Sequence, residues 1–202
     1  VGAGANNQGG SGDSAIAIGA YAGANNQQST SIAIGSYAGA NIQSTYSVGI
    51  GYSAGRYTQG TYSVALGYSA GNDRQGTSAV AIGRLAGNSL QSNYGIGIGY
   101  SAGLTQQGTK GVAVGSQAGQ YYQGSYSIAI GDSAASSNQS TYAIAIGAAA
   151  GYQSQNASAI AIGNAAGSYS QNAYAIAIGW NAGYTGQGNN SIAIGWGTAA
   201  DP

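Results

Sequence analysis

Residues 31–46 read SIAIGSYAGANIQSTY, and this sixteen-residue unit recurs along nearly the whole chain. A glycine follows an apolar residue at twelve positions spaced by sixteen, beginning at Gly19. A glutamine recurs at the same spacing from Gln27 onward, and a small pair such as Ala38-Gly39 lies between the two. A fixed spacing without insertions indicates a repeat protein in which each unit stacks on the next.

The unit has the pattern of a short strand followed by turns. Ile32-Ala33-Ile34 alternates large and small side chains, which is typical of a strand. The frequent glycines disfavour a helix interior, and sixteen residues are too few for a helical hairpin. The sequence therefore predicts an all-β fold, a parallel β-solenoid of about twelve 16-residue coils. At ~4.8 Å per coil, the rod would be on the order of 58 Å long.

The ends of the chain depart from the repeat. Residues 3–8 read AGANNQ and recur as residues 22–27, nineteen positions later instead of sixteen. We expect residues 1–14 to form a partial first coil with a three-residue insertion, and residues 15–202 to form a single repeat domain whose twelfth repeat is incomplete. Because the chain lacks a starting methionine and stops within a repeat, we expect it to be a processed protein or a section of a longer one.

Composition excludes several function classes. The chain has four basic and four acidic residues and no Cys or His, so thiolate, imidazole and zinc-finger chemistry are absent. It has no basic patch for nucleic acid, and its apolar runs are too short to insert into a membrane. Asp73 and Arg74 are adjacent and form no spaced carboxylate pair. We therefore expect no enzyme activity, no catalytic residue, no cofactor and no metal site.

The two faces of the repeated strand differ in size. Ile16 and Ile18 lie on one face, and Ala15, Ala17 and Gly19 lie on the other. We expect the Ile and Val ladders to be buried by their own coil. A column restricted to Ala and Gly implies a close neighbour, so we expect a second chain to cover that face. This reasoning predicts an oligomer, either a homotrimer or a filament.

The glutamine column has two interpretations. A row of amides could bind sugar or order water, or stacked identical amides could form a structural ladder that satisfies itself and the turn. We favour the structural ladder because polar groups at a repeated turn need partners. The residues assigned to this ladder are Ile18, Gly19, Ile34, Gly35, Gln27, Gln43, Gln59, Gln75, Gln91, Gln107, Gln123, Gln139, Gln155, Gln171 and Gln187.

Aromatic residues form columns that could contact a ligand. One column lies just before the strand and consists of Tyr46, Tyr62, Tyr94, Tyr126, Tyr142 and Tyr174. A second follows the repeated glycine and contains Tyr52, Tyr68, Tyr100, Trp180 and Trp196, with Tyr21 and Tyr37 one position later. Such rings could stack on carbohydrate, on one another or against a neighbouring chain, and we favour contacts among rings and chains.

The repeat resembles a known family. Ser31-Ile32-Ala33-Ile34-Gly35 followed by Ala38-Gly39 is similar to the head repeat of trimeric autotransporter adhesins and to repeats of phage and large-virus tail fibres. The similarity extends from about residue 15 to residue 197. It implies a left-handed parallel β-roll in which three chains pack around one axis and bind host surfaces. The adhesin repeat is shorter and lacks the strict glutamine, and no heptad pattern of a stalk occurs here.

These observations predict a non-enzymatic structural and adhesive rod of an extracellular fibre on a cell or virion surface. The columns of residues 24–26 and their repeats would be presented to a host-surface glycan or protein. One alternative is the subunit of a self-assembling extracellular filament, since no capping coil is evident. A lower-ranked alternative is an ice- or carbohydrate-binding solenoid, because threonine fills about half of its best column.

Overall fold

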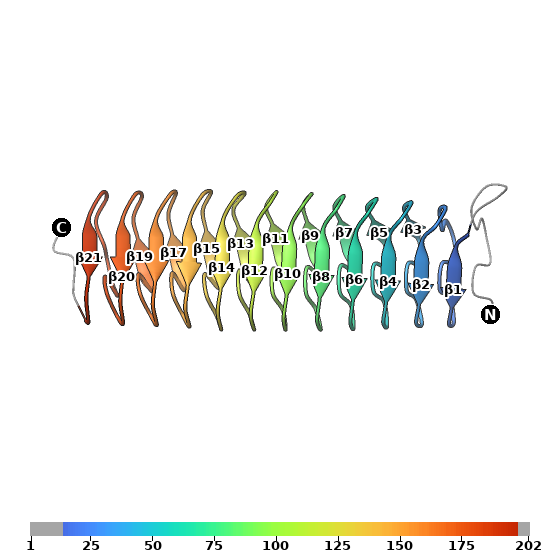
Figure 1. Ribbon diagram of the computed structural model, residues 1–202, viewed down its shortest axis with the longest axis horizontal. Coiled ribbons are helices and arrows are strands. Elements are labelled where there is room, and N and C mark those ends of the chain that lie inside the picture. Colours follow the sequence, from blue (N-terminus) through green and yellow to red (C-terminus); the bar gives the residue numbers. More distant parts are fainter. Residues whose placement is uncertain (1–13, 198–202) are drawn as a thin grey trace.

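The computed structural model describes residues 14–197, and these residues form an all-β parallel solenoid of about 11 coils with no helix (Figure 1). The predicted all-β parallel β-solenoid is therefore confirmed, with about 11 coils in place of about twelve. The predicted three-residue insertion and the end of the last repeat lie outside the described residues.

Two parallel sheets run along the length of the rod. The larger, sheet I, has twelve strands contributed by the repeated Ile-Ala-Ile segment. Its strands are β1 (Ile16–Ile18), β2 (Ile32–Ile34), β4 (Val48–Ile50), β6 (Val64–Leu66), β8 (Val80–Ile82), β10 (Ile96–Ile98), β12 (Val112–Val114), β14 (Ile128–Ile130), β16 (Ile144–Ile146), β18 (Ile160–Ile162), β20 (Ile176–Ile178) and β21 (Ile192–Ile194).

The smaller, sheet II, has nine strands, each of which ends at the repeated glutamine. Its strands are β3 (Ile42–Gln43), β5 (Thr58–Gln59), β7 (Asp73–Gln75), β9 (Ser89–Gln91), β11 (Thr105–Gln107), β13 (Tyr121–Gln123), β15 (Ser137–Gln139), β17 (Gln153–Gln155) and β19 (Tyr169–Gln171). Isolated bridges from Gln27 to Gln43 and from Tyr169 to Thr185 continue this pairing at its two ends. The repeat pattern predicts the glutamine in a turn, so sheet II is an element that the sequence did not predict.

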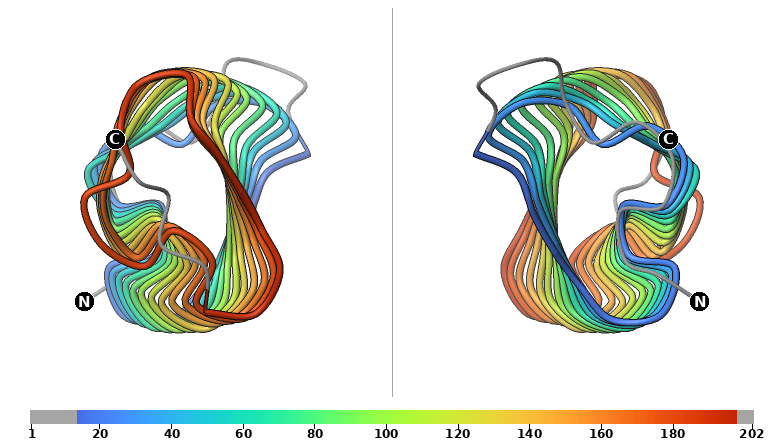
Figure 2. Two further views of the ribbon diagram at one scale, coloured as in Figure 1. Left: turned by 90° about the vertical axis from the view of Figure 1, so that its left-hand side faces the viewer. Right: turned by 90° about the vertical axis from the view of Figure 1, so that its right-hand side faces the viewer.

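The coils pair in register, so that equivalent positions of successive repeats lie side by side. In sheet I, Ile96 pairs with Val112 and Gly97 with Ala113. In sheet II, Gln107 pairs with Gln123. Viewed along the rod in Figure 2, the coils superimpose with a small turn from each to the next. Such a gradual turn is expected because β-strands twist.

The interior of the solenoid consists of alanine and glutamine. Ala33 and Ala38 are fully buried, as are their equivalents in most coils, and the largest fully buried side chains are glutamines. The prediction that the Ile and Val ladders lie inside, with the Ala and Gly strip outside, is therefore wrong. The space enclosed by each coil is filled by the methyl groups of alanines and by the side chain of one glutamine. The branched side chains lie on the outer surface, where Ile18 is 58% exposed and Ile194 63%.

Candidate functional site

The glutamine column lies inside the coil and links three structural features. Gln107 Nε2 donates hydrogen bonds to the carbonyl oxygen of Ile96 in sheet I at 2.7 Å and to that of Gly111 at 3.1 Å. The same amino group donates to Gln123 Oε1 of the next coil at 3.0 Å, and Gln107 Oε1 accepts from Gln91 Nε2 at 2.9 Å. Gln107 thus joins sheet II to sheet I and one coil to the next. The column is inaccessible to a ligand because its members are buried.

The amide ladder is continuous over parts of the rod. It runs from Gln43 to Gln59, from Gln75 to Gln123 and from Gln139 to Gln187 through hydrogen bonds of 2.9–3.2 Å. Within residues 14–197, the side-chain oxygens of Gln43, Gln75 and Gln139 have no hydrogen-bond partner. Where these interruptions occur, the donation from each glutamine to the sheet I carbonyl is retained, for example from Gln123 to the Val112 oxygen at 2.7 Å. The hydrogen bond from the glutamine to the sheet I carbonyl therefore recurs more regularly along the rod than the hydrogen bond between successive glutamines.

The outward face of sheet I is a flat aliphatic surface. It is formed by the first and third residues of every strand, and we refer to it as the aliphatic face. Ile18, Leu66, Ile98, Ile130 and Ile194 are among its exposed side chains, between 37% and 63% exposed. At about 50 Å by 10 Å, the face covers on the order of 500 Å². The largest apolar patch of a monomeric protein is typically of about this size, and it is often a binding surface.

The tyrosines predicted as ligand contacts lie on the surface, just before the strands of sheet I. All six are exposed, between 46% and 62%. Tyr46 stacks on Tyr62 with ring centroids 5.2 Å apart, and Tyr126 stacks on Tyr142 at the same distance. Lys110 Nζ lies 5.2 Å from the centre of the Tyr126 ring. Much of this column therefore contacts itself, although the outer ring faces stay accessible.

Other aromatic rings also pair along the rod. In the column that follows the repeated glycine, Tyr52 stacks on Tyr68 and Trp180 on Trp196, each pair with centroids 5.2 Å apart. Near the C-terminal end, Tyr169 meets Tyr184 edge to face at 5.3 Å. The charge of the neighbouring Tyr184 and a hydrogen bond to it raise the pKa of Tyr169 above its usual value. Ring stacking at the coil spacing is thus a general property of this surface.

One group of side chains departs from the repeat and encloses a hollow of about 260 Å³ near the N-terminal end of the described coils. Its lining residues are Tyr21, Ala24, Asn25, Tyr37, Ala40, Asn41 and Arg56. They come from the turn that follows the sheet I strands and from the approach to sheet II, not from the aliphatic face. Sequence analysis did not identify this group. The available signal was the pentapeptide YAGAN, which occurs at residues 21–25 and again at residues 37–41.

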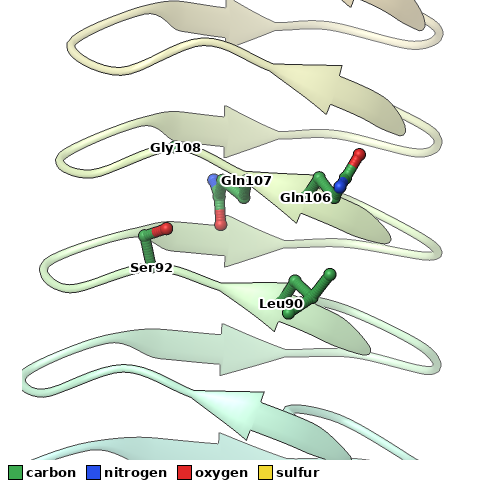
Figure 3. Close-up of a pocket in the computed structure, with 5 residues that line it drawn as sticks. All are labelled: Leu90, Ser92, Gln106, Gln107 and Gly108. Carbon is green, nitrogen blue, oxygen red and sulfur yellow. The ribbon is translucent and has the colours of Figure 1, made fainter.

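A second hollow, of about 270 Å³, lies between two coils at sheet II (Figure 3). Leu90 and Ser92 from one coil and Gln106, Gln107 and Gly108 from the next line it. The lining contains no charged or aromatic side chain, and Gln107 is already committed to the buried ladder. This hollow therefore offers less chemistry for recognition than the one near Tyr21.

The charged side chains are few and dispersed. Asp73 and Arg74 form an ion pair at 3.2 Å on the surface. Arg84 lies over the rings of Tyr68 and Tyr100 at 5.9 Å and 5.5 Å. Within residues 14–197 no three His, Cys, Asp or Glu side chains are grouped so as to hold a metal ion. Over the same residues, no helix is long and apolar enough to cross a membrane.

No protein-family model, no curated protein and no solved structure matches this chain.

Proposed function

We propose that this chain is a structural and adhesive rod of an extracellular fibre on a cell or virion surface, assembled as a homotrimer. In this proposal each chain forms a left-handed β-roll of 16-residue coils, and three chains pack through their aliphatic faces around a common axis. The outward columns of the turns and of sheet II then stay free to bind a host-surface glycan or protein. The role is mechanical and binding, and it uses no catalytic group.

The observation that carries the proposal is the exposed aliphatic face of sheet I. We assign its occupant as further copies of the same chain. Equivalent side chains of identical rods recur at the same interval, so the ridges of one rod match the grooves of another along their whole length. The chain has zero net charge, which removes long-range repulsion between copies. The face covers on the order of 500 Å², and the tyrosine columns before and after the sheet I strands add to it toward the ~800 Å² per partner of a stable interface.

The mass of the assembled particle tests this proposal. We expect light scattering at several concentrations to give three chains at each of them. A double variant, Ile98→Lys with Ile130→Lys, places two charges in the aliphatic face and is expected to give single chains, because a buried unpaired charge costs several kcal/mol. The control is Gln106→Lys with Asn138→Lys, which alters exposed residues of sheet II in the same coils and is expected to leave the mass unchanged.

The other outcomes of the same measurement contradict the proposal. A mass that grows with concentration indicates the filament subunit in place of the trimer. A wild-type protein that stays a single chain overturns the assignment of the aliphatic face. Equal loss of assembly in the Ile98/Ile130 and Gln106/Asn138 variants would show that added charge, not its position, breaks the particle.

A further inference from the structure

The hollow near Tyr21 has the geometry of a small binding site. Tyr21 and Tyr37 occupy the same place in successive coils and stack with centroids 4.9 Å apart and an angle of 8° between the rings. Tyr21 covers one face of Tyr37 and Arg56 lies over the other, so the two rings meet the hollow mainly at their edges. Tyr21 is 36% exposed, so its ring is accessible from solvent. The edges of aromatic rings carry partial positive charge and suit the oxygen atoms of a sugar.

The floor of the hollow is formed by two alanines. Ala24 and Ala40 are buried, and their side chains are too small to fill the space beside the tyrosines. In the next coil the equivalent residue is Arg56, and in the following coils it is Asn72 and Asn88. The larger side chains end the hollow on that side. A volume of about 260 Å³ is below the range of drug-sized pockets and suits a single ring.

Arg56 supplies the positive charge of the site. Its guanidinium carbon lies 4.7 Å from the centre of the Tyr37 ring and 4.9 Å from that of Tyr57. These contacts position the guanidinium group, which is planar. Among residues 14–197 its side chain has no carboxylate partner and makes no hydrogen bond. Its N–H donors, which lie in that plane, are therefore available for an anion, and the fork geometry fits a carboxylate.

Two asparagines complete the hydrogen-bonding set. Asn25 Nδ2 donates to Asn41 Oδ1 at 2.8 Å, which orients both amides across neighbouring coils. Asn25 Oδ1 and Asn41 Nδ2 make no side-chain hydrogen bond within the described part of the chain. The pair thus presents one acceptor and one donor to the hollow. A sugar hydroxyl, which both donates and accepts, is the matching group.

We infer that this hollow binds a carboxylate-bearing pyranose, that is, an acidic sugar unit of a surface glycan. The pyranose lies beside the edges of the Tyr21 and Tyr37 rings, its carboxylate pairs with Arg56, and its hydroxyls pair with Asn25 and Asn41. This inference rests on the proposed adhesive role and specifies the ligand class of one end of the rod.

A matched pair of sugars tests the inference. Methyl β-D-glucuronide and methyl β-D-glucoside differ in the carboxylate, and their binding to the assembled protein is followed by ligand-observed NMR titration. We expect the glucuronide to bind with a Kd in the millimolar range, at least about tenfold tighter than the glucoside. Arg56→Gln is expected to weaken glucuronide binding at least about tenfold and to leave the glucoside unchanged. Arg84→Gln, which removes an equal charge that also lies over tyrosine rings, is expected to change neither.

Three results would overturn the inference: equal binding of the two sugars, no saturable binding of the glucuronide, or the same loss in Arg56→Gln and Arg84→Gln. Circular dichroism and particle mass show whether each variant keeps its fold. The sugar titration is independent of the mass measurement. A three-chain particle that does not bind the glucuronide would leave the fibre proposal intact and refute this binding site. A single chain that binds the glucuronide selectively would support the site and refute the trimeric fibre.

Discussion

Replacement of Gln107 by glutamate is expected to lower the free energy of unfolding at pH 7 by roughly 3–5 kcal/mol. The glutamine side chain is fully buried, and its amino group donates to two carbonyl oxygens and to the next glutamine. A carboxylate in the same place has no donor for these three acceptors. It adds a buried negative charge beside three oxygen atoms. The measurement is the urea midpoint of unfolding at a fixed chain concentration.

The loss of stability in Gln107→Glu is expected to depend on pH. The environment of the new carboxyl determines whether stability rises or falls with pH. Burial and the neighbouring carbonyl oxygens both favour the neutral acid, so the pKa of the new carboxyl is raised in the folded protein above its unfolded value of about 4.3. The folded state then holds the proton more tightly than the unfolded state. The variant is consequently most stable below that unfolded pKa, and stability falls as the pH rises toward the folded pKa. The chain has no histidine and no glutamate, so the pH dependence of the variant has few other sources.

Gln106→Glu is the control for this experiment. Gln106 precedes Gln107 in β11 but is exposed, and Figure 3 shows the two side chains extending in different directions from the strand. Its substitution changes the same amide to the same carboxyl without burying it, and surface changes of this kind are usually within about 0.5 kcal/mol. Similar midpoints and similar pH profiles for the two variants would show that the buried ladder is not what holds sheet II to sheet I.

Hydrophobicity alone could not predict which face of the sheet I strands points into the coil. The alternation of Ile32, Ala33 and Ile34 identifies the strand, and the sixteen-residue spacing identifies the solenoid. Area arguments place the larger apolar side chains inside, because burial of isoleucine releases more free energy than burial of alanine. In this chain the small volume enclosed by a coil determines which side chains lie inside. One buried glutamine per coil already occupies the space beside the alanines, so no room is left for a branched side chain.

The candidate sites differ in how far the sequence could reveal them. The six tyrosines before the strands form a visible column, and the structure places them on the surface as pairs and single rings. The hollow near Tyr21 depends instead on what is absent, namely large side chains at Ala24 and Ala40. A search for charged or aromatic residues overlooks such positions. Sheet II was also missed, because two- and three-residue strands of variable composition carry no alternating pattern.

Replacement of Gly83 by alanine is expected to lower the free energy of unfolding by roughly 2–6 kcal/mol, as the sum of two costs of about 1–3 kcal/mol each. The first is conformational, since Gly83 has φ +123°, where side chains are rarely accommodated. The second is steric, because an added Cβ would lie 2.6 Å from the carbonyl oxygen of Gly99 and 2.9 Å from its carbonyl carbon. These are backbone atoms of the next coil, so relief requires the coils to separate. The urea midpoint and the mass of the particle report the loss.

Gly186→Ala separates the two costs, because Gly186 has φ +63° and nothing lies within 4 Å of its added Cβ. It is expected to lose about 1–2 kcal/mol, the conformational cost alone. Equal losses at Gly83 and Gly186 would refute the steric argument.

The chain itself contains a related substitution, since Ala135 (φ 45°) occupies the place that Gly119 and Gly151 hold in the adjacent coils. At Gly119 an added Cβ would meet the side-chain end of Gln123, which can shift, whereas at Gly83 it meets backbone, which is fixed by both neighbouring coils. The same physical difference explains why glycine is retained at all twelve positions of the Gly83 column while the column of Gly119 accepts alanine.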